Sequence, residues 1–465
     1  MQAVRRAACW LDKRLGFSSA ILPVIRHPVP RSVNWWYVFG SATLVAFLVQ
    51  VVTGVALAFS YVPAPNSAYE TLQFITHQAV LGNIVRGIHY WGASAMVVLI
   101  FVHLCRTFLM GSYKFPRELN WLTGVLLFGL TLGMAFTGQL LRWDQDAYWA
   151  VVVGAEQAGR VPVVGDLLAQ VLVAGQTVGG ATLTRFYATH VFLFPALIFA
   201  LVGIHLYLVV RHGISEPPGR RDVVDPATYE ARYQELIHQE GVPFWPDAAW
   251  RDVLFALAVG AAVVLLAVVI GPATLGDKAD PTNIQANPRP DWYFLWYFAL
   301  LALMPPGLEN WFMVGFPLLV VVVLLALPFV APAGERSPFR RPWAVGVVGF
   351  CALSIGTLVW YGSVSPWSPN FQPAPLPATV TQGLSGDALR GAQLFQAKDC
   401  ITCHTIAGTG GQRGPDLSTI GDQLSPDQLT WRIATGGNNM PAYGATLQPA
   451  EMAALVDFLS QLRSR

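Results

Sequence analysis

The sequence predicts an all-α protein, in which a multi-span transmembrane helical bundle is followed by a small soluble α-helical domain. The chain of 465 residues is 54% hydrophobic and 12% charged, a balance that is too apolar for a soluble globular protein. A spanning helix needs about 20 mostly apolar residues. Seven stretches meet that length without an internal charge: 36–60, 87–105, 119–141, 186–210, 253–276, 311–334 and 342–362.

An eighth apolar run, Trp292–Leu308, is shorter and is interrupted by Pro305-Pro306. We predict that it forms a re-entrant or interfacial helix and does not cross the membrane. Lysines and arginines concentrate on the side of the membrane that holds the N-terminus, which predicts that the N-terminus is cytoplasmic. Seven spans that start in the cytoplasm place the C-terminus outside.

Five segments are predicted along the chain. A four-span core comes first, and a polar connector rich in charge follows it. A region with three spans leads into a proline-rich linker, which is typical of an extended spacer. The last segment is a small domain of ordinary soluble composition. The predicted bounds of the five segments are 1–215, 216–250, 251–362, 363–383 and 384–465.

Four of the nine histidines lie inside predicted spans, where ionisable groups are costly and usually functional. His89 and His103 are 14 residues apart on the second span, and His190 and His205 are 15 apart on the fourth. In an α-helix these spacings return to within about 40° and 60° of the starting direction and separate the residues by about 21–22 Å. Because both spans run in the same direction, His89 should face His190, and His103 should face His205.

This arrangement predicts two cofactors stacked across the bilayer, each clamped between two helices. Two neutral imidazoles on one iron give a non-covalent, bis-histidine b-type haem that is suited to electron transfer. The alternative is four polar residues hydrogen-bonded between helices, which two matched pairs disfavour. A flat porphyrin can lie against a helix backbone at a glycine. Glycines on the first and third spans share the 14-residue spacing: Gly40 and Gly54, and Gly124 and Gly138.

The sequence Cys400-Ile-Thr-Cys403-His404 in the last segment is a c-type haem attachment motif. It predicts one covalent haem, with thioether bonds to both cysteines and His404 as an axial ligand. Met440 is the predicted second axial ligand, because Met/His ligation raises the reduction potential; a lone core methionine is the alternative. Such haems are attached outside the cytoplasmic membrane. The prediction is therefore a bacterial cytoplasmic (inner) membrane protein with this domain on the periplasmic side.

Several motifs in the spans resemble one family. Residues 25–365 resemble the cytochrome b of cytochrome bc complexes, especially the plastid and cyanobacterial form and its bacterial relatives. The three-span region resembles the separate smaller subunit of the plastid complex, and the tail resembles small class I cytochromes c. The motifs are Arg86-Gly-Ile-His89-Tyr-Trp91, Pro116-Arg117-Glu118-Leu119, Trp143-Asp144-Gln145, Thr184-Arg185-Phe186-Tyr187 and Pro338-Phe339-Arg340-Arg341-Pro342. The resemblance implies that Arg86 meets a haem propionate and that the complex is a homodimer.

The chain departs from this family at two places. The plastid-type protein binds an extra haem through a cysteine on the first helix, and the matching position here is Val38. We therefore expect no haem at that position. The family's usual Gly-Tyr and Pro-Trp near the outer quinol pocket read Gly138-Gln139 and Arg142-Trp143 here. These changes fall at the predicted substrate pocket.

The sequence Pro290-Asp291-Trp292-Tyr293 resembles the family's Pro-Glu-Trp-Tyr signature of the outer quinol site. A carboxylate beside bound quinol can accept a proton released on oxidation, and Tyr293 can hydrogen-bond there. The alternative for Asp291 is a cap on the following helix. Near the inner end of the fourth span, Arg211 and His212 are candidates for a cytoplasmic quinone pocket, or for membrane-end anchors.

The resemblance implies the quinol cycle, coupled to proton translocation across the lipid membrane. Quinol near Asp291 gives one electron to a Rieske iron–sulfur partner and the other to the two b haems in turn. The Rieske centre then reduces the tethered c haem, which passes its electron to a cytochrome c or another acceptor. Three alternatives remain: a dihaem anchor of a formate dehydrogenase or hydrogenase, an oxidase subunit, and an electron conduit without quinone sites. The histidine count disfavours an oxidase, and no nucleic acid partner is predicted.

Overall fold

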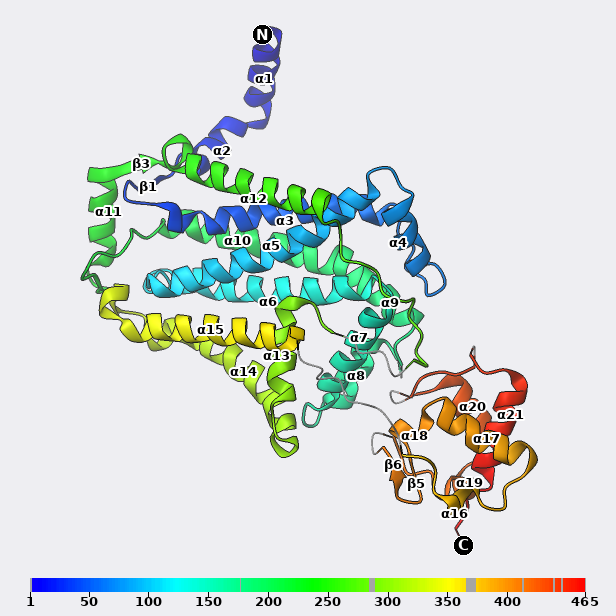
Figure 1. Cartoon of the computed structure of the whole chain (residues 1–465). Coiled ribbons are helices and arrows are strands. Elements are labelled where there is room, and N and C mark those ends of the chain that lie inside the picture. The colour runs from blue at the N-terminus through cyan, green and yellow to red at the C-terminus, as the bar shows by residue number, and fades with distance from the viewer. Residues whose placement is uncertain are drawn as a thin grey trace.

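The computed structural model describes residues 2–175, 177–283, 289–364, 374–411, 414–437, 440–444 and 446–464. Its long helices lie side by side in one bundle, and a small C-terminal domain lies beyond one end of that bundle (Figure 1). In these described ranges seven helical segments are long and apolar enough to span a membrane, as predicted. They are Phe39–Ala58, Gly82–Leu109, Glu118–Leu140, Gly180–His212, Phe244–Val269, Leu308–Val330 and Pro342–Val364.

The first four spans form the core that carries the histidines. Three of them are single helices, α3 (Phe39–Ala58), α5 (Gly82–Leu109) and α6 (Glu118–Leu140). The fourth consists of α9 (Gly180–Ala188), a π-helical turn (Thr189–Leu193) and α10 (Phe194–His212).

The π-helical turn Thr189–Leu193 lies just before Pro195. Pro195 has no backbone N–H and would crowd the carbonyl one turn before it, so a regular helix cannot continue through it. In the turn the Phe194 N–H donates to the Thr189 carbonyl five residues earlier. The fourth span therefore stays helical through the proline but gains one residue in that turn.

Short helices close one end of the bundle. They are α4 (Ala68–His77), α7 (Gln145–Gly159) and α8 (Gly165–Val173). Helix α7 begins at Asp144, which is fully buried and whose Oδ1 accepts a hydrogen bond of 2.9 Å from the Ala147 N–H. Leu140, Trp143 and Tyr148 belong to the apolar cluster against which α7 packs. We call this end, with the loop that leads to Asp291, the Asp291 face.

The three remaining spans pack beside this core. They are α12 (Ala249–Val269), α14 (Pro306–Val330) and α15 (Pro342–Val364). The eighth apolar run forms the short helix α13 (Trp292–Ala302), which ends before Pro305-Pro306. Its Leu295 packs so closely on α15 that a Cβ at Gly362 would lie 2.9 Å from the Leu295 Cγ.

The opposite end of the bundle is closed by the polar connector. Here α1 (Gln2–Leu15) and α2 (Phe17–Ile25) lead into the core, and α11 (Tyr229–Glu240) lies across the end. Two short antiparallel strand pairs join distant parts of the chain at this end. They are β1 (Pro28–Pro30) with β3 (Gly241–Pro243), and β2 (Val223–Val224) with β4 (Gly334–Glu335).

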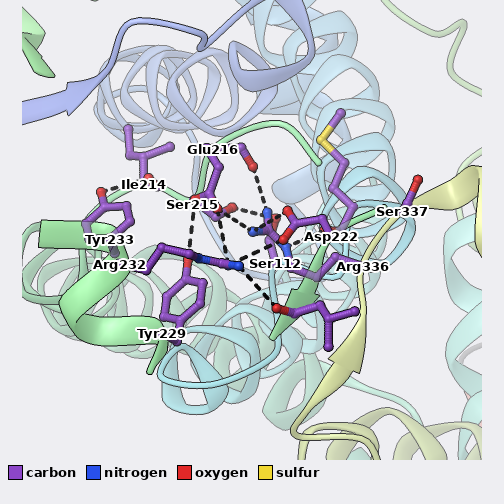
Figure 2. A network of polar contacts seen from close by, with 12 residues as sticks. Ser112, Ile214, Ser215, Glu216, Asp222, Tyr229, Arg232, Tyr233, Arg336 and Ser337 are labelled. Carbon is purple, nitrogen blue, oxygen red and sulfur yellow. Dashed lines mark hydrogen bonds and ion pairs between the residues drawn. The ribbon is translucent and has the colours of Figure 1, made fainter. Parts of the chain in front are cut away.

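A buried arginine organises this second end, which we call the Arg336 face. The Arg336 side chain is 1% exposed. Its Nη1 lies 3.0 Å from Glu216 Oε1 and 3.2 Å from Asp222 Oδ2, and its Nη2 donates to the Glu216 carbonyl at 2.6 Å (Figure 2). Its Nε also donates to the Met110 carbonyl at 3.3 Å. The loop after α14 is thereby tied to the connector and to the loop after α5.

The C-terminal domain has its own apolar core. Helices α17 (Gly386–Ala397) and α21 (Pro449–Ser460) cross there, with the Phe395 and Phe458 rings 5.9 Å apart. The crossing needs Gly391, because a Cβ there would lie 2.0 Å from the Ala454 carbonyl oxygen. The other elements are α16 (Ala378–Thr381), α18 (Cys400–Cys403), α19 (Ile420–Gln423), α20 (Pro426–Thr435), β5 (Thr405–Ile406) and β6 (Thr409–Gly410).

This domain draws on residues that the sequence assigns to the linker. Leu376 is 7% exposed and belongs to the domain's apolar core, and Val380 packs against the same core. Residues 365–373 of the predicted linker lie outside the described residues. In Figure 1 the domain lies beyond the end of the bundle that carries α7 and α8. Tyr443 of the domain interacts electrostatically with Asp280 of the loop after α12.

Candidate redox sites

The structure brings the four span histidines together in the two predicted pairs. The rings of His89 on α5 and His190 on the fourth span have centroids 6.3 Å apart and planes inclined by 76°. Two metal–nitrogen bonds of about 2 Å, extended to the centres of two imidazole rings, come to about 6 Å. The spacing therefore fits one metal ion between the rings. His103 and His205 are also close enough to interact electrostatically.

The π-helical turn corrects the register that the sequence alone suggests. A spacing of 15 residues in a regular α-helix would leave His190 about 60° away from the direction of His205. His190 instead lies within the turn Thr189–Leu193, which contains one extra residue. The extra residue brings His190 and His205 onto the same face of the fourth span. His89 and His103 reach the same arrangement on the second span with a spacing of 14 residues.

Each of the four glycines lies against one of these histidines. A Cβ built at Gly138 would lie 2.6 Å from the His190 Cε1, which is a clash. The same construction gives 3.0 Å from Gly40 to His103, 3.2 Å from Gly54 to His89 and 3.6 Å from Gly124 to His205. Because glycine has no side chain, each imidazole can approach the neighbouring helix closely. The contact is closest at Gly138, where any side chain would clash with His190. Both outer glycines also line a cavity beside the outer histidines.

Three of the histidines hydrogen-bond to the hydroxyl of a threonine that directly precedes the neighbouring glycine. The sequence analysis did not identify these three threonines. Thr53 Oγ1 lies 2.9 Å from His89 Nδ1, Thr123 Oγ1 lies 2.8 Å from His205 Nδ1, and Thr137 Oγ1 lies 3.1 Å from His190 Nδ1. The Thr-Gly dipeptide on the first and third spans was the available signal. The residue before Gly40, opposite His103, is Phe39.

These hydroxyls determine which ring nitrogen is free. Thr53 donates its hydroxyl proton to the Val49 carbonyl at 2.7 Å, and Thr123 and Thr137 make the same bond to the carbonyl four residues earlier. The hydroxyl oxygen therefore accepts from the imidazole Nδ1–H. This tautomer leaves the Nε2 lone pair available for a metal, an arrangement typical of metal-binding histidines.

An arginine lies one helical turn beyond each histidine of α5. Arg86 precedes His89 by three residues, and its guanidinium donates to Thr76 Oγ1 at 3.0 Å and to the Ala273 carbonyl at 2.8 Å. Arg106 follows His103 by three residues and stacks 3.6 Å from the Tyr37 ring centroid. In the described structure its Nε and Nη2 are buried without a hydrogen-bond partner. Sequence reasoning found Arg86 and missed Arg106, although the mirror spacing about the histidines was visible.

One cavity joins the outer histidine pair to the predicted quinol residues. Its lining includes Gly54, Gly138, His89 and His190, and it extends to Asp291, Tyr293, Gln139 and Arg142. A molecule held near Asp291 would therefore lie in the same cavity as a cofactor between His89 and His190.

Asp291 and Tyr293 act as a pair in this cavity. The Tyr293 hydroxyl donates a hydrogen bond of 2.7 Å to Asp291 Oδ2. Burial, with the neighbouring Asp291 carboxylate, holds the pKa of Tyr293 well above its ordinary value, so the phenol remains a donor. The Asp291 side chain makes no hydrogen bond to the start of α13, which is the cap that the alternative reading would require.

The inner candidates Arg211 and His212 stand in the last turn of α10. Arg211 is exposed, and the His212 backbone carbonyl accepts a hydrogen bond of 3.1 Å from Arg117 Nη2. Arg117 also donates to the Gly213 carbonyl at 2.9 Å. These contacts fix the backbone at the end of the fourth span, and the quinone-pocket role of the Arg211 and His212 side chains stays a prediction.

The attachment motif of the C-terminal domain occupies the single-turn helix α18 and the residue after it. His404 Nδ1 lies 2.9 Å from the Pro415 carbonyl, which can only accept, so Nδ1 carries the proton and Nε2 is free for a metal. Gly414 lies against this ring, because a Cβ there would be 2.6 Å from the His404 Cε1. Met440 packs against the same apolar core as Cys400. The donor set fits a haem with His and Met ligands.

Comparisons with known families and structures agree with this arrangement. Residues 24–213 match the model "Cytochrome b/b6/petB", residues 278–379 match "Cytochrome b(C-terminal)/b6/petD", and residues 386–459 match "Cytochrome C oxidase, cbb3-type, subunit III".

Relatives and a solved structure extend the similarity. The chain is 43% identical over 210 residues to cytochrome b6 of Heliobacterium mobile, which covers 45% of this chain and 99% of the relative. It is 41% identical over 217 residues to the menaquinol:cytochrome c reductase cytochrome b subunit of Bacillus subtilis, covering 45% of this chain and 96% of the relative. A structure described as hyperthermophilic respiratory Complex III aligns with a TM-score of 0.64 at 27% identity, over 77% of this chain and 91% of the other.

Proposed function

The chain belongs to the cytochrome b/b6 family, and we propose that it oxidises quinol in the Asp291 cavity as the cytochrome b/c subunit of a bc-type quinol:cytochrome c reductase complex. The observation that carries the proposal is the continuity of that cavity, which holds the outer histidine pair and the Asp291–Tyr293 pair together. A dihaem anchor or passive conduit has no need for such a carboxylate beside the outer pair.

His89 with His190, and His103 with His205, would each hold one non-covalent b haem. Cys400 and Cys403 would bind one c haem covalently, and His404 and Met440 would bind its iron. When bound, these haems supply one-electron carriers across the membrane and on the C-terminal domain. Arg106, whose guanidinium is buried and incompletely bonded, provides a cation for a propionate of the inner b haem.

Asp291 is the proton acceptor in the quinol pocket. Oxidation of quinol releases protons with the electrons, so a carboxylate within reach of a ring hydroxyl assists the reaction. Tyr293 holds Asp291 Oδ2 through its hydroxyl and orients the carboxylate toward the cavity. Because the pKa of Tyr293 is raised, this hydrogen bond persists at neutral pH.

The proposal includes partners and an orientation. A Rieske iron–sulfur subunit takes one electron from quinol, and an external cytochrome c or similar acceptor takes electrons from the C-terminal domain. The N-terminus is cytoplasmic and the Asp291 face is periplasmic in a bacterial inner membrane, with the complex as a homodimer. The location of the C-terminal domain beyond the Asp291 face supports this orientation (Figure 1).

The test is quinol-driven reduction of the purified complex. A synthetic naphthoquinol and a synthetic benzoquinol are mixed separately with the oxidised complex, and the b and c absorbance bands are followed by stopped flow. We expect both band sets to be reduced, and an inhibitor bound in the outer cavity should prevent both reductions. If the haems are present but neither quinol reduces them, the chain is a passive conduit and the proposal is wrong.

A further inference from the structure

Gln139 carries an unsatisfied buried amide and is one of the residues that line the outer cavity. It is 5% exposed and lies in the last turn of α6, directly after Gly138. Within the ranges that the structure describes, neither its Oε1 nor its Nε2 has a hydrogen-bond partner. A buried amide without partners destabilises the fold unless a ligand supplies them. Because Gln139 lines the cavity, a ligand in the cavity is the available partner.

Arg142 lies three residues further on and lines the same cavity. In the turn that follows α6, the Arg142 N–H donates to the Gln139 carbonyl at 3.3 Å, and both residues line the cavity. Its Nε is 3.4 Å from Asp144 Oδ2, an ion-pair contact that lacks hydrogen-bond geometry, and its Nη2 is 4.0 Å from Asp146 Oδ2. The side chain is 18% exposed. The wall therefore combines a cation with uncommitted N–H donors.

The charged side chains around the cavity include two arginines. Among the described residues that line it, the charged side chains are those of Arg86, Arg142 and Asp291. The charge of Arg142 acts unfavourably on Arg86, and Asp144, which lies 3.4 Å from Arg142 Nε, acts favourably on it. Two like charges facing one cavity of low dielectric are stabilised by an anion between them.

Arg86 alone is poorly placed to neutralise two carboxylates. Its Nη1 and Nη2 already donate to Thr76 and to the Ala273 carbonyl. The inner site differs, because Arg106 has two buried nitrogens without partners. At the inner site, Arg106 alone supplies N–H groups that lack hydrogen-bond partners in the described part of the chain. At the outer site, Gln139 and Arg142 supply such groups together.

We propose that Gln139 and Arg142 together bind a carboxylate of the outer b haem, as a second propionate site in addition to Arg86. The inference rests on the outer haem of the proposed function. Gln139 follows the glycine that touches His190, which places this wall at the rim of the histidine pair. The quinol residues Asp291 and Tyr293 come instead from the loop before α13 and the start of that helix. Arg142 also acts electrostatically on Tyr293, so the test below is designed to separate a haem carboxylate from a quinol oxygen as the ligand.

The test uses the complex loaded with haem whose propionates carry ¹³C, without added quinol. Redox-difference infrared spectra report the carboxylate bands, and a visible redox titration reports the outer haem potential. Arg142→Gln and Gln139→Leu remove the two sides of the site. Arg160→Gln removes an exposed arginine at the end of α7 and serves as the matched control.

We expect both site variants to shift the labelled carboxylate bands, and the control to leave them unchanged. Loss of the Arg142 charge should also lower the outer haem's reduction equilibrium constant about tenfold, or ~59 mV for one electron, since a nearby cation favours the reduced haem. If Arg142→Gln fails to assemble because Asp144 is left unpaired, Arg142→Lys keeps the charge. That variant should still shift the bands while changing the potential little.

Unchanged bands together with a raised quinol KM would overturn the proposal and assign the pair to quinol. This result differs from failure of the proposed function itself, in which the wild-type complex would show no outer b haem or no reduction by quinol.

Discussion

Two buried polar clusters, one at each end of the bundle, differ in how completely their groups are hydrogen-bonded. On the Arg336 face the buried arginine is surrounded by acceptors from the connector and from the loop after α5. On the Asp291 face Gln139 has no hydrogen-bond partner within the described chain, and the Arg142 Nε lacks hydrogen-bond geometry toward Asp144. Both ends are built from charged loops between apolar helices, so composition alone does not separate them.

The difference indicates that one cluster has a structural role and the other a ligand-binding role. A fully bonded ion network fixes how chain segments meet and offers nothing to a ligand. Its members come from segments far apart in the sequence, so the Arg336 face holds the four-span and three-span regions in register (Figure 2). An incompletely bonded wall around a cavity gains its partners when a ligand binds. The predictions below test this contrast, from the largest expected effect to the smallest.

The largest effect is expected from removing a haem ligand on the Asp291 face. His190→Leu should eliminate the outer b haem and about half of the b-haem absorbance, because one axial ligand no longer holds the iron. Quinol-driven reduction should be lost as well. The control His77→Leu, at the exposed end of α4, should keep both b haems. Full b-haem content in His190→Leu, measured by pyridine haemochrome assay, would refute the pairing.

Asp291→Asn should lower the quinol oxidation rate by about 10²–10⁴-fold, the usual contribution of a positioned general base. The b and c spectra should be unchanged, because Asp291 holds no haem. The rate is measured by steady-state reduction of an external cytochrome c. The control Asp277→Asn changes an exposed carboxylate on the same face. If both variants slow the reaction equally, Asp291 has no special role.

Arg336→Met should destabilise the protein by about 3–5 kcal/mol, because it removes the buried cation that pairs with the largely buried carboxylates of Glu216 and Asp222. Arg232→Met is the matched control, since Arg232 pairs with the same Glu216 and Asp222 but its side chain is 49% exposed. That change should cost only about 0–1 kcal/mol. Thermal unfolding in detergent, followed by loss of the b spectrum, measures both. Equal losses of stability would contradict the role of burial.

Thr137→Val should have the smallest effect, weakening retention of the outer haem by about 10-fold as expected for a residue that orients a metal ligand. The change removes the oxygen that accepts from His190 Nδ1–H. Haem transfer to apomyoglobin measures retention, and electron paramagnetic resonance of the oxidised haem reports ring orientation. Thr131→Val is the control, because Thr131 makes the same backbone bond on α6. An identical change in both variants would assign the effect to helix packing.

The spans were predictable because they depend on local composition. Seven apolar stretches of sufficient length became seven helical segments, and Pro305-Pro306 correctly limited the eighth run to α13. Helices α7 and α8 were not identified, because their apolar residues mix with polar ones and they form by packing against loops from distant segments. The membership of Leu376 in the C-terminal core was missed for the same reason, since burial is not visible in a proline-rich stretch.

Only the parts of the site that follow from residue spacing along a single helix could be predicted from the sequence. Spacings of 14 and 15 residues on two spans that run in the same direction were enough to pair the histidines, and the 14-residue spacing of the glycines was enough to place them. The extra residue of the Thr189–Leu193 turn was not visible, because it depends on how Pro195 is accommodated. The threonine hydroxyls and Arg106 were missed because their roles depend on contacts between helices, which no single-helix pattern contains.

The central claim is that this chain holds two b haems of distinct environment and one c haem that quinol can reduce. A redox-titrated visible spectrum of the purified complex, recorded with and without quinol, tests it most directly. We predict two b-type components of different potential and one c-type component reduced at higher potential, all reducible by quinol. A single b-type component would contradict the account, as would a second covalently bound haem.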